Sequence, residues 1–291
     1  METAPGPAGG SGWRPGEVRS ADGTTIGYYR AGKGPAVILL HGAAQSADNL
    51  RTLAGDLSDR FSVFVPDRRG RGRSGAYADF RGLQTEIEDL FALLDASGAH
   101  RVFGLSAGAV IAIETARLRP DIAKLALYEP PLSFDGVVHG EWLPEYERRL
   151  DEGRPGAALA AVLKGTADRG PVRLVPALLL GGIFDLAIKR TAGRPVPAGT
   201  VSPRDLIPTV RFDARTVREA AGALERFATL SCEVLLLGGS RSARNLQASL
   251  DGLSAVLPHA RKVVIRGVGH TAADNGGQPR RVAAELGRFF S

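Results

Sequence analysis

The sequence predicts an α/β fold in which a mostly parallel central sheet carries helices on both faces. Short apolar, β-branched runs alternate with helical patterns along most of the 291 residues. A hydrophobic content of 44% is sufficient for one large core. Between residues 133 and 212 the alternation stops, and helical patches broken by Gly and Pro replace it. We therefore expect a single elaborated domain with a helical insertion.

Each expected strand is an apolar run bounded by turn residues. The candidate strands are Thr25 to Tyr29, Ala36 to Leu40, Ser62 to Pro66, Arg101 to Leu105, Lys124 to Tyr128, Glu233 to Leu237 and Lys262 to Ile265. Apolar residues at helical spacing predict helices over Gln84 to Leu94, with Gly98 as the stop, and over Ala109 to Leu118. Another helix is expected to begin near Pro279.

The domain organisation follows from these elements. Residues 1–16 are rich in Pro and Gly and lack the apolar stretch of a signal peptide, so we expect a flexible tail. Residues 17–132 and 213–291 form the expected core, and residues 133–212 the expected helical cap. For the apolar cap residues, packing on the core is favoured over lining a substrate pocket. They include Trp142, Tyr146, Leu178, Leu179, Ile183 and Phe184.

Composition argues against several classes of protein. The nearest approach to a membrane span, Leu174 to Ile188, contains Pro176 and Asp185, so we expect no membrane partner. The single cysteine, Cys232, is expected to be a small buried hydrophobe, which fits a cytoplasmic protein. The formal charge is +6, but basic residues are scattered among acids, so no nucleic-acid partner is expected.

A serine nucleophile is indicated by Gly104-Leu105-Ser106-Ala107-Gly108, which joins an expected strand to an expected helix. A GxSxG turn in that context is a nucleophile elbow, which lifts the serine hydroxyl above the sheet. An idle serine in a glycine-rich turn is the alternative. Because a serine hydroxyl is a weak nucleophile, it needs an imidazole base and a carboxylate that orients the imidazole.

His270 is the candidate base, because it lies in a loop between the last expected strand and the helix near Pro279. A structural histidine is the alternative there. His100, His139 and His259 have no motif around them and are expected at the surface.

The glycine-rich turn at His41-Gly42-Ala43-Ala44 is expected to supply backbone N–H groups to an oxyanion, so His41 is not expected to transfer protons. The expected donors are the N–H groups of Ala43, or of Ala44 instead, and of Ala107.

Taken in order, His41-Gly42, the segment Asp67 to Ser74, GxSxG at Ser106 and Gly267-Val268-Gly269-His270 resemble the α/β-hydrolase fold superfamily. The similarity covers nearly everything after about Val18. It implies a serine-nucleophile member with a cap inserted after the sixth strand.

The acid departs from the usual pattern of that family. Ser242 stands where most members carry it, at the end of Leu235-Leu236-Leu237-Gly238-Gly239-Ser240-Arg241-Ser242. A minority pattern, similar to that of haloalkane dehalogenases, places the acid after the sixth strand, and Glu129 occupies that position. We therefore expect Glu129 to be the acid. A structural glutamate, Asp251, Asp213 or a degenerate triad are the alternatives.

No cofactor is expected. Gly70 to Gly75 matches GxGxxG, but the next strand ends at Ser106 and not at an acid, so the match is treated as accidental. There is also no histidine or cysteine cluster with metal-ligand spacing.

The expected function is a serine hydrolase that cleaves a carboxylic ester or lactone with an apolar body through an acyl-enzyme. Thioester and carbon–carbon bond hydrolysis stay open, as does the oligomeric state. The rival hypotheses are a lyase or cyclase of secondary metabolism on the same fold, and a catalytically lapsed protein that binds a small molecule.

Overall fold

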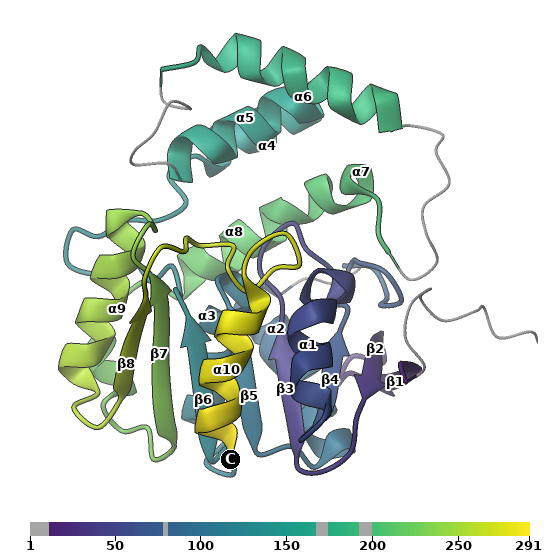
Figure 1. The fold of residues 1–291 in the computed structure, drawn as a ribbon. Helices are drawn as coiled ribbons and strands as arrows, with labels where there is room; N and C mark the ends of the chain where they lie inside the picture. The colour runs from purple at the N-terminus through teal and green to yellow at the C-terminus, as the bar shows by residue number, and fades with distance from the viewer. Residues whose placement is uncertain (1–11, 78–80, 167–173, 192–199) are drawn as a thin grey trace, which may run out of the picture.

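The computed structural model describes residues 12–77, 81–166, 174–191 and 200–291. Its centre is an eight-stranded sheet with the order β1-β2-β4-β3-β5-β6-β7-β8 (Figure 1). The strands are β1 (Arg14–Arg19), β2 (Thr25–Ala31), β3 (Ala36–Leu40), β4 (Ser62–Pro66), β5 (Arg101–Leu105), β6 (Lys124–Tyr128), β7 (Glu233–Gly239) and β8 (Arg261–Ile265). Strands β3 to β8 pair in parallel, and β1 and β2 pair antiparallel at one edge. The predicted α/β fold class is confirmed.

Strand β1 was not predicted, and it takes in residues 14–16 of the expected tail. This strand lies at the sheet edge and is mostly exposed, so its sequence carries little apolar signal. It is held by antiparallel pairing to β2, in which Val18 lies opposite Ile26. The tail prediction is therefore wrong for this part, and residues 1–11 lie outside the described residues.

The helices are α1 (Arg51–Ser58), α2 (Leu83–Ser97), α3 (Ala107–Leu118), α4 (Leu143–Asp151), α5 (Pro155–Thr166), α6 (Ala177–Thr191), α7 (Pro203–Leu206), α8 (Val210–Glu219), α9 (Arg244–Val256) and α10 (Pro279–Phe290). Short 3-10 turns cover Ala47–Leu50, Ile207–Thr209 and Leu224–Phe227. Helix α2 is capped by Gly98, which follows it and whose φ of 61° is a left-handed conformation that favours glycine.

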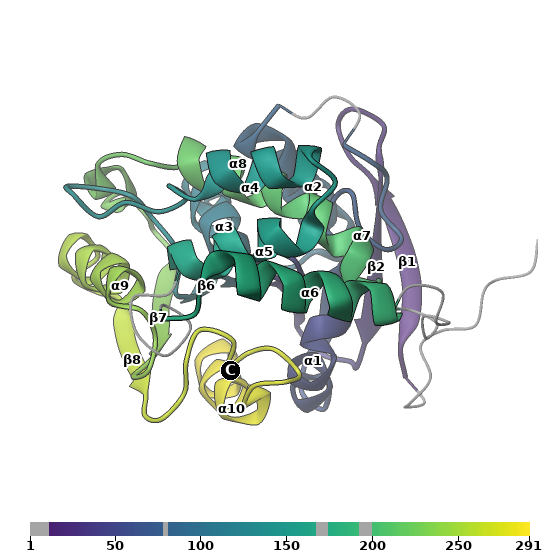
Figure 2. The same ribbon diagram turned by 90° about the horizontal axis from the view of Figure 1, so that it is seen from above.

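The helices cover both faces of the sheet, because side chains alternate along each strand. Val37 and Leu39 belong to the core beneath α1 and α10. Ile38 and Leu40 belong to the opposite core, beneath α2, α3 and α9. Figure 2 shows α1 and α10 on one side of the sheet and α2 and α3 on the other. Because β5, β6, β7 and β8 run parallel, the carboxyl ends of β5, β6 and β8 lie at the same edge of the sheet.

Helices α4 to α8 form the insertion between β6 and β7, and α4 to α6 lie above that edge (Figure 1). Helices α4, α5, α6 and α8 share a small core that includes the fully buried Tyr146. The C-terminal half of α8 returns to the main core through Val217. The expected core packing of Leu178, Leu179 and Ile183 is wrong, because all three are exposed on α6. None of the described helices is both long and apolar enough to cross a membrane.

Candidate active site

Ser106 lies in a strained turn between β5 and α3, with φ of 55° and ψ of −119°. Two glycines permit the turn. A Cβ on Gly104 would lie 2.5 Å from the Cα of Ala109, and one on Gly108 would lie 2.6 Å from the carbonyl oxygen of His41. Because helix α3 must pass this close to β5 and β3, neither position accepts a side chain. The elbow therefore projects Ser106 from the sheet edge.

His270 lies in the loop after β8, and its Nε2 atom is 3.0 Å from the Oγ atom of Ser106. Its Nδ1 atom is 2.7 Å from Oε2 of Glu129. The carboxylate can only accept a hydrogen bond, so Nδ1 carries the proton and Nε2 is free to accept from the serine hydroxyl. The structure thus places three residues that are far apart in the chain in one continuous hydrogen-bonded chain.

Glu129 follows β6 with φ of 47°, and its side chain is fully buried. Its second carboxylate oxygen accepts a hydrogen bond from the backbone N–H of Gly239 at 2.6 Å. A Cβ on Gly238 would lie 3.1 Å from this oxygen. Both carboxylate oxygens therefore have a donor, which compensates for removing the charge from water.

Contacts from β6 and β7 hold the loop that carries His270. The hydroxyl of Tyr128 donates to the carbonyl of Gly269 at 2.8 Å, and burial raises the pKa of this hydroxyl above its usual range. The N–H of Arg241 donates to the carbonyl of Val268 at 2.9 Å. A side chain on Gly239 would collide with that same carbonyl. The two glycines at the end of β7 thus let the loop approach Glu129.

The turn after β3 passes beside Ser106, since a Cβ on Gly42 would lie 3.2 Å from the Cβ of that serine. The N–H of Gly42 donates to Gln45 at 2.8 Å, and the N–H of Ala44 to Asp213 at 3.3 Å. Within the described part of the chain, the N–H groups of Ala43 and Ala107 have no acceptor. This difference favours Ala43 over Ala44 as an oxyanion donor.

His41 is fully buried beneath this turn. Its Nε2 atom accepts from the N–H of Arg68 at 3.2 Å, and its Nδ1 atom lies 2.9 Å from the carbonyl oxygen of Gly42. Burial, together with the charges of Arg71 and Arg68, holds the pKa of His41 well below its usual value. A neutral His41 supports the turn and lies outside the hydrogen-bonded chain that contains Ser106.

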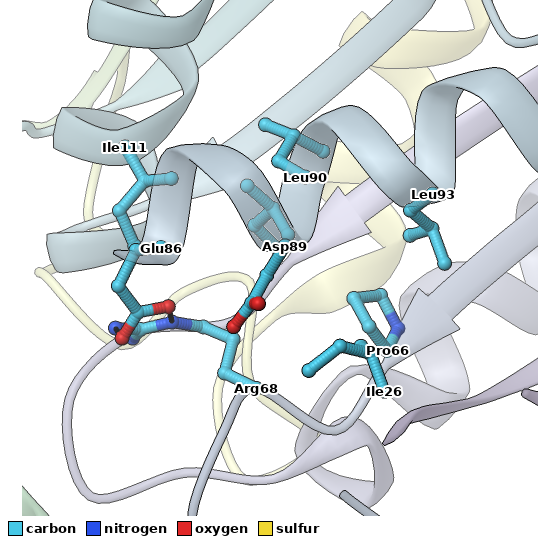
Figure 3. Close-up of a pocket in the computed structure, with 9 residues that line it drawn as sticks. Ile26, Pro66, Arg68, Glu86, Asp89, Leu90, Leu93 and Ile111 are labelled. Carbon is cyan, nitrogen blue, oxygen red and sulfur yellow. Dashed lines mark hydrogen bonds and ion pairs between the residues drawn. The ribbon is translucent and has the colours of Figure 1, made fainter. Parts of the chain in front are cut away.

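The arginine cluster after β4 is buried in ion pairs. Arg68 pairs with Glu86 at 2.6 Å, and both Arg68 and Arg71 pair with Asp213, at 2.9 and 2.7 Å. Figure 3 shows Arg68 and Glu86 beside a small cavity of about 20 Å³. That volume holds roughly one water molecule, so it is too small for a substrate. These arginines fasten the loop to α2 and α8.

The other candidate acids form ion pairs that do not involve His270. Asp213 is held by the two arginines, and Asp251 forms a surface ion pair with Lys262. Ser242 is buried, and its hydroxyl has no hydrogen-bond partner among the described residues. Glu129 is thus the carboxylate that the fold brings to His270.

The contacts of three residues near His270 were not predicted from the sequence. Gln45 joins Gly42 to Asp274, to which its amide donates at 2.7 Å, and Asp274 lies four residues after His270. His139, expected at the surface, is only partly exposed and lies 3.1 Å from Ser249 Oγ. Burial, with a smaller effect of His270, lowers the pKa of His139 to about 4. No sequence motif marks the contact of Gln45 with Asp274 or that of His139 with Ser249, because each joins distant segments.

No group of three or more His, Cys, Asp or Glu residues within the described ranges is arranged to hold a metal ion. Cys232, expected to be buried, is half-buried against the main core, and burial raises the pKa of its thiol to about 11.

Comparison with known proteins agrees with this fold. Residues 37–285 match the model of the alpha/beta hydrolase family. The chain belongs to the alpha/beta hydrolase family. A solved relative, an alpha/beta hydrolase from Sphaerobacter thermophilus, is 30% identical with a TM-score of 0.76, over 95% of this chain and 100% of that one.

The present chain is also similar to two curated proteins. The uncharacterized hydrolase YraK of Bacillus subtilis is 29% identical over 135 residues, which is 45% of this chain and only 49% of that protein. The pimeloyl-[acyl-carrier protein] methyl ester esterase of Xanthomonas campestris is 27% identical over 268 residues, 89% of this chain and 96% of that protein.

Proposed function

We propose that this protein is a serine hydrolase that cleaves a carboxylic ester or lactone with an apolar body through an acyl-enzyme. The observation that carries the proposal is the hydrogen-bonded chain from Glu129 through His270 to Ser106. With its proton on Nδ1, His270 has a free Nε2 atom that can accept the proton of the Ser106 hydroxyl. The similarity to a methyl ester esterase over most of both chains supports ester chemistry.

In the first half of the reaction, Ser106 Oγ bonds to the substrate carbonyl carbon while its proton passes to Nε2 of His270. Glu129 stabilises the imidazolium that forms. The N–H groups of Ala43 and Ala107 donate to the developing oxyanion, and such donors act most strongly in a site that excludes water. The ester C–O bond then breaks, and the leaving oxygen takes the proton from His270.

In the second half, a water molecule gives a proton to His270 and attacks the acyl carbon. The bond from the carbonyl carbon to Ser106 Oγ breaks, and His270 returns the proton to Oγ. The products are a carboxylic acid and an alcohol, or one hydroxy acid from a lactone. This sequence requires neither a metal nor a redox cofactor.

An apolar substrate body is supported by the surroundings of the oxyanion turn. Ala44 packs at the edge of the small core of α4, α5 and α8, together with Trp142 and Leu159. These side chains place apolar surface next to the turn that contains Ala43. Apolar walls with a few polar groups are typical of small-molecule sites.

The nucleophile can be tested with a fluorophosphonate probe, followed by mass spectrometry of the labelled peptide. We expect one adduct, on Ser106, and its loss in Ser106→Ala. We also expect p-nitrophenyl ester turnover to fall by about 10⁴-fold or more in that variant. Persistent labelling in Ser106→Ala would exclude the assignment. Turnover of a non-ester substrate without any adduct would favour a lyase or cyclase instead.

A further inference from the structure

Helix α6 exposes a broad apolar face. Leu178 is 76% exposed, Leu179 56%, Ile183 53% and Leu186 49%. Their spacing puts them on one side of the helix, around Gly182. Together with Pro176 and Gly182 they form one continuous, open surface. Contiguous exposed apolar surface of this kind is uncommon on soluble monomers and marks interaction sites.

The other side of α6 already serves the fold. Leu180 is buried, and Gly181 passes close to Ala157 of α5, whose Cα would lie 3.1 Å from an added Cβ. Asp185, the single acid of α6, turns inward and accepts a hydrogen bond from the N–H of Gly156 at 2.7 Å. A Cβ on Gly182, by contrast, would meet nothing. Among the described residues, the contacts that attach α6 to the protein come from its other side, and the exposed face makes none of those named here.

Two cations continue this face. Lys189 and Arg190 are exposed and follow Leu186 by three and four residues, so they lie on the same side of the helix. The face thus combines large apolar side chains with positive charge at one end. No carboxylate of α6 lies on this face, because Asp185 turns inward. A partner that fits must offer apolar groups and negative charge together.

A second copy of the chain fits poorly. In a symmetric pair of parallel α6 helices, Lys189 and Arg190 would face the same cations of the other copy. In an antiparallel pair they would face the positive end of the helix dipole. An anionic lipid surface satisfies both features, because acyl chains accept the leucines and headgroups attract the cations.

The position of α6 allows such contact. It is the helix that lies farthest from the sheet (Figure 1), and it packs on α5. It also lies above the edge of the sheet where Ser106 and His270 meet. We propose that the exposed face of α6 docks the protein on an anionic lipid surface. The expectation of no membrane partner rested on the lack of a spanning segment, and a helix lying on a surface needs none.

The test is sedimentation of the full chain with phosphatidylcholine vesicles, with and without phosphatidylglycerol, at low and high salt. We expect binding that requires phosphatidylglycerol and weakens with salt. Leu179→Gln with Ile183→Gln should lower the partition coefficient at least about tenfold. Lys189→Gln with Arg190→Gln should lower it about tenfold and remove the preference for phosphatidylglycerol.

Val264→Gln is the matched control, because Val264 is exposed to a similar extent, 49%, but lies on β8. It should bind as the wild type does, and all variants should keep the wild-type circular dichroism spectrum. Absence of binding to phosphatidylglycerol vesicles would overturn the proposal, as would equal binding by the leucine-face variant. A dimer in sedimentation velocity that the same substitutions dissociate would assign the face to a second copy. None of these results depends on Ser106.

Discussion

Glu129 combines a left-handed backbone, complete burial and a hydrogen-bond donor for each carboxylate oxygen. A non-glycine residue at φ of 47° is strained by about 1–3 kcal/mol, and such strain persists where surrounding contacts hold it. Here the N–H of Gly239 and the ring of His270 hold the carboxylate. At the scale of single residues, the carboxylate that meets His270 follows β6, whereas the position of Ser242, after the neighbouring strand β7, carries no carboxylate.

Glu129→Gln should lower kcat by up to about 10⁴-fold while the fold stays intact. If the amide oxygen still accepts the hydrogen bond from the N–H of Gly239, the amide nitrogen donates to Nδ1 of His270. This favours the tautomer with the proton on Nε2, which cannot accept the Ser106 proton. The measurement is ester turnover together with circular dichroism. Asp251→Asn, a surface acid, serves as the control and should be neutral. Near-wild-type turnover in Glu129→Gln would reassign the acid.

At the scale of elements, loops from different strands are locked to one another by close backbone approach. Gly239 at the end of β7 faces the carbonyl of Val268, and this approach brings the His270 loop to Glu129. The turn after β3 is tied to the same loop through Gln45 and Asp274. His270 and the proposed oxyanion donors are thereby positioned by one connected set of contacts.

Gly239→Ala should destabilise the protein by about 1–3 kcal/mol and lower kcat, because the Val268 backbone must move and carry His270 with it. Gly269→Ala is the matched control, since an added Cβ there meets nothing although it adjoins His270. Urea unfolding and ester turnover would measure both effects. Equal behaviour of the two variants would contradict this account of Gly239.

Gln45→Met should lower kcat about tenfold with little change in KM, because the loss of order in the turn weakens oxyanion stabilisation and not substrate binding. Gln84→Met, on the exposed side of α2, is the control. Steady-state kinetics with a short p-nitrophenyl ester separates the two constants. A rise in KM at constant kcat would show that Gln45 acts on substrate binding instead.

At the scale of the whole molecule, charge that looks scattered in the sequence is organised by the fold. Arg68, Arg69 and Arg71 are buried and meet carboxylates of α2, α8 and the N-terminal edge. The neutral His41 lies among them, and His139 lies in the segment after β6. Two histidines with lowered pKa values make the folded state sensitive to acid.

Stability should fall as the pH drops below about 6.5, the usual pKa of histidine. The unfolded chain then takes up protons that the folded state refuses, so each such histidine costs about 1.4 kcal/mol per pH unit. For His139 the loss ends near its folded pKa of about 4. Urea unfolding across this range should give a shallower slope for His139→Gln than for the wild type. An unchanged slope would mean that His139 is protonated in the folded protein.

Much of the fold could be predicted, because short apolar runs between turn residues are local signals. The bounds of β3, β4, β5 and β6 agree with prediction to the residue. Strand β1 was missed, since an exposed edge strand is held by backbone pairing and carries no apolar pattern. Ser106 and His270 could be proposed from motifs, and Glu129 from a family resemblance, whereas their catalytic roles stay predictions.

The chain's local pattern was sufficient for the alternation of strands and helices and for the elbow at Ser106, because both depend on neighbours in the sequence. Tertiary structure alone decided which carboxylate reaches His270 and that Gln45 joins two loops, since these contacts span more than a hundred residues. It also decided that the leucines of α6 face outward. That helix is apolar on most sides, so only its packing on α5 determines which side stays exposed.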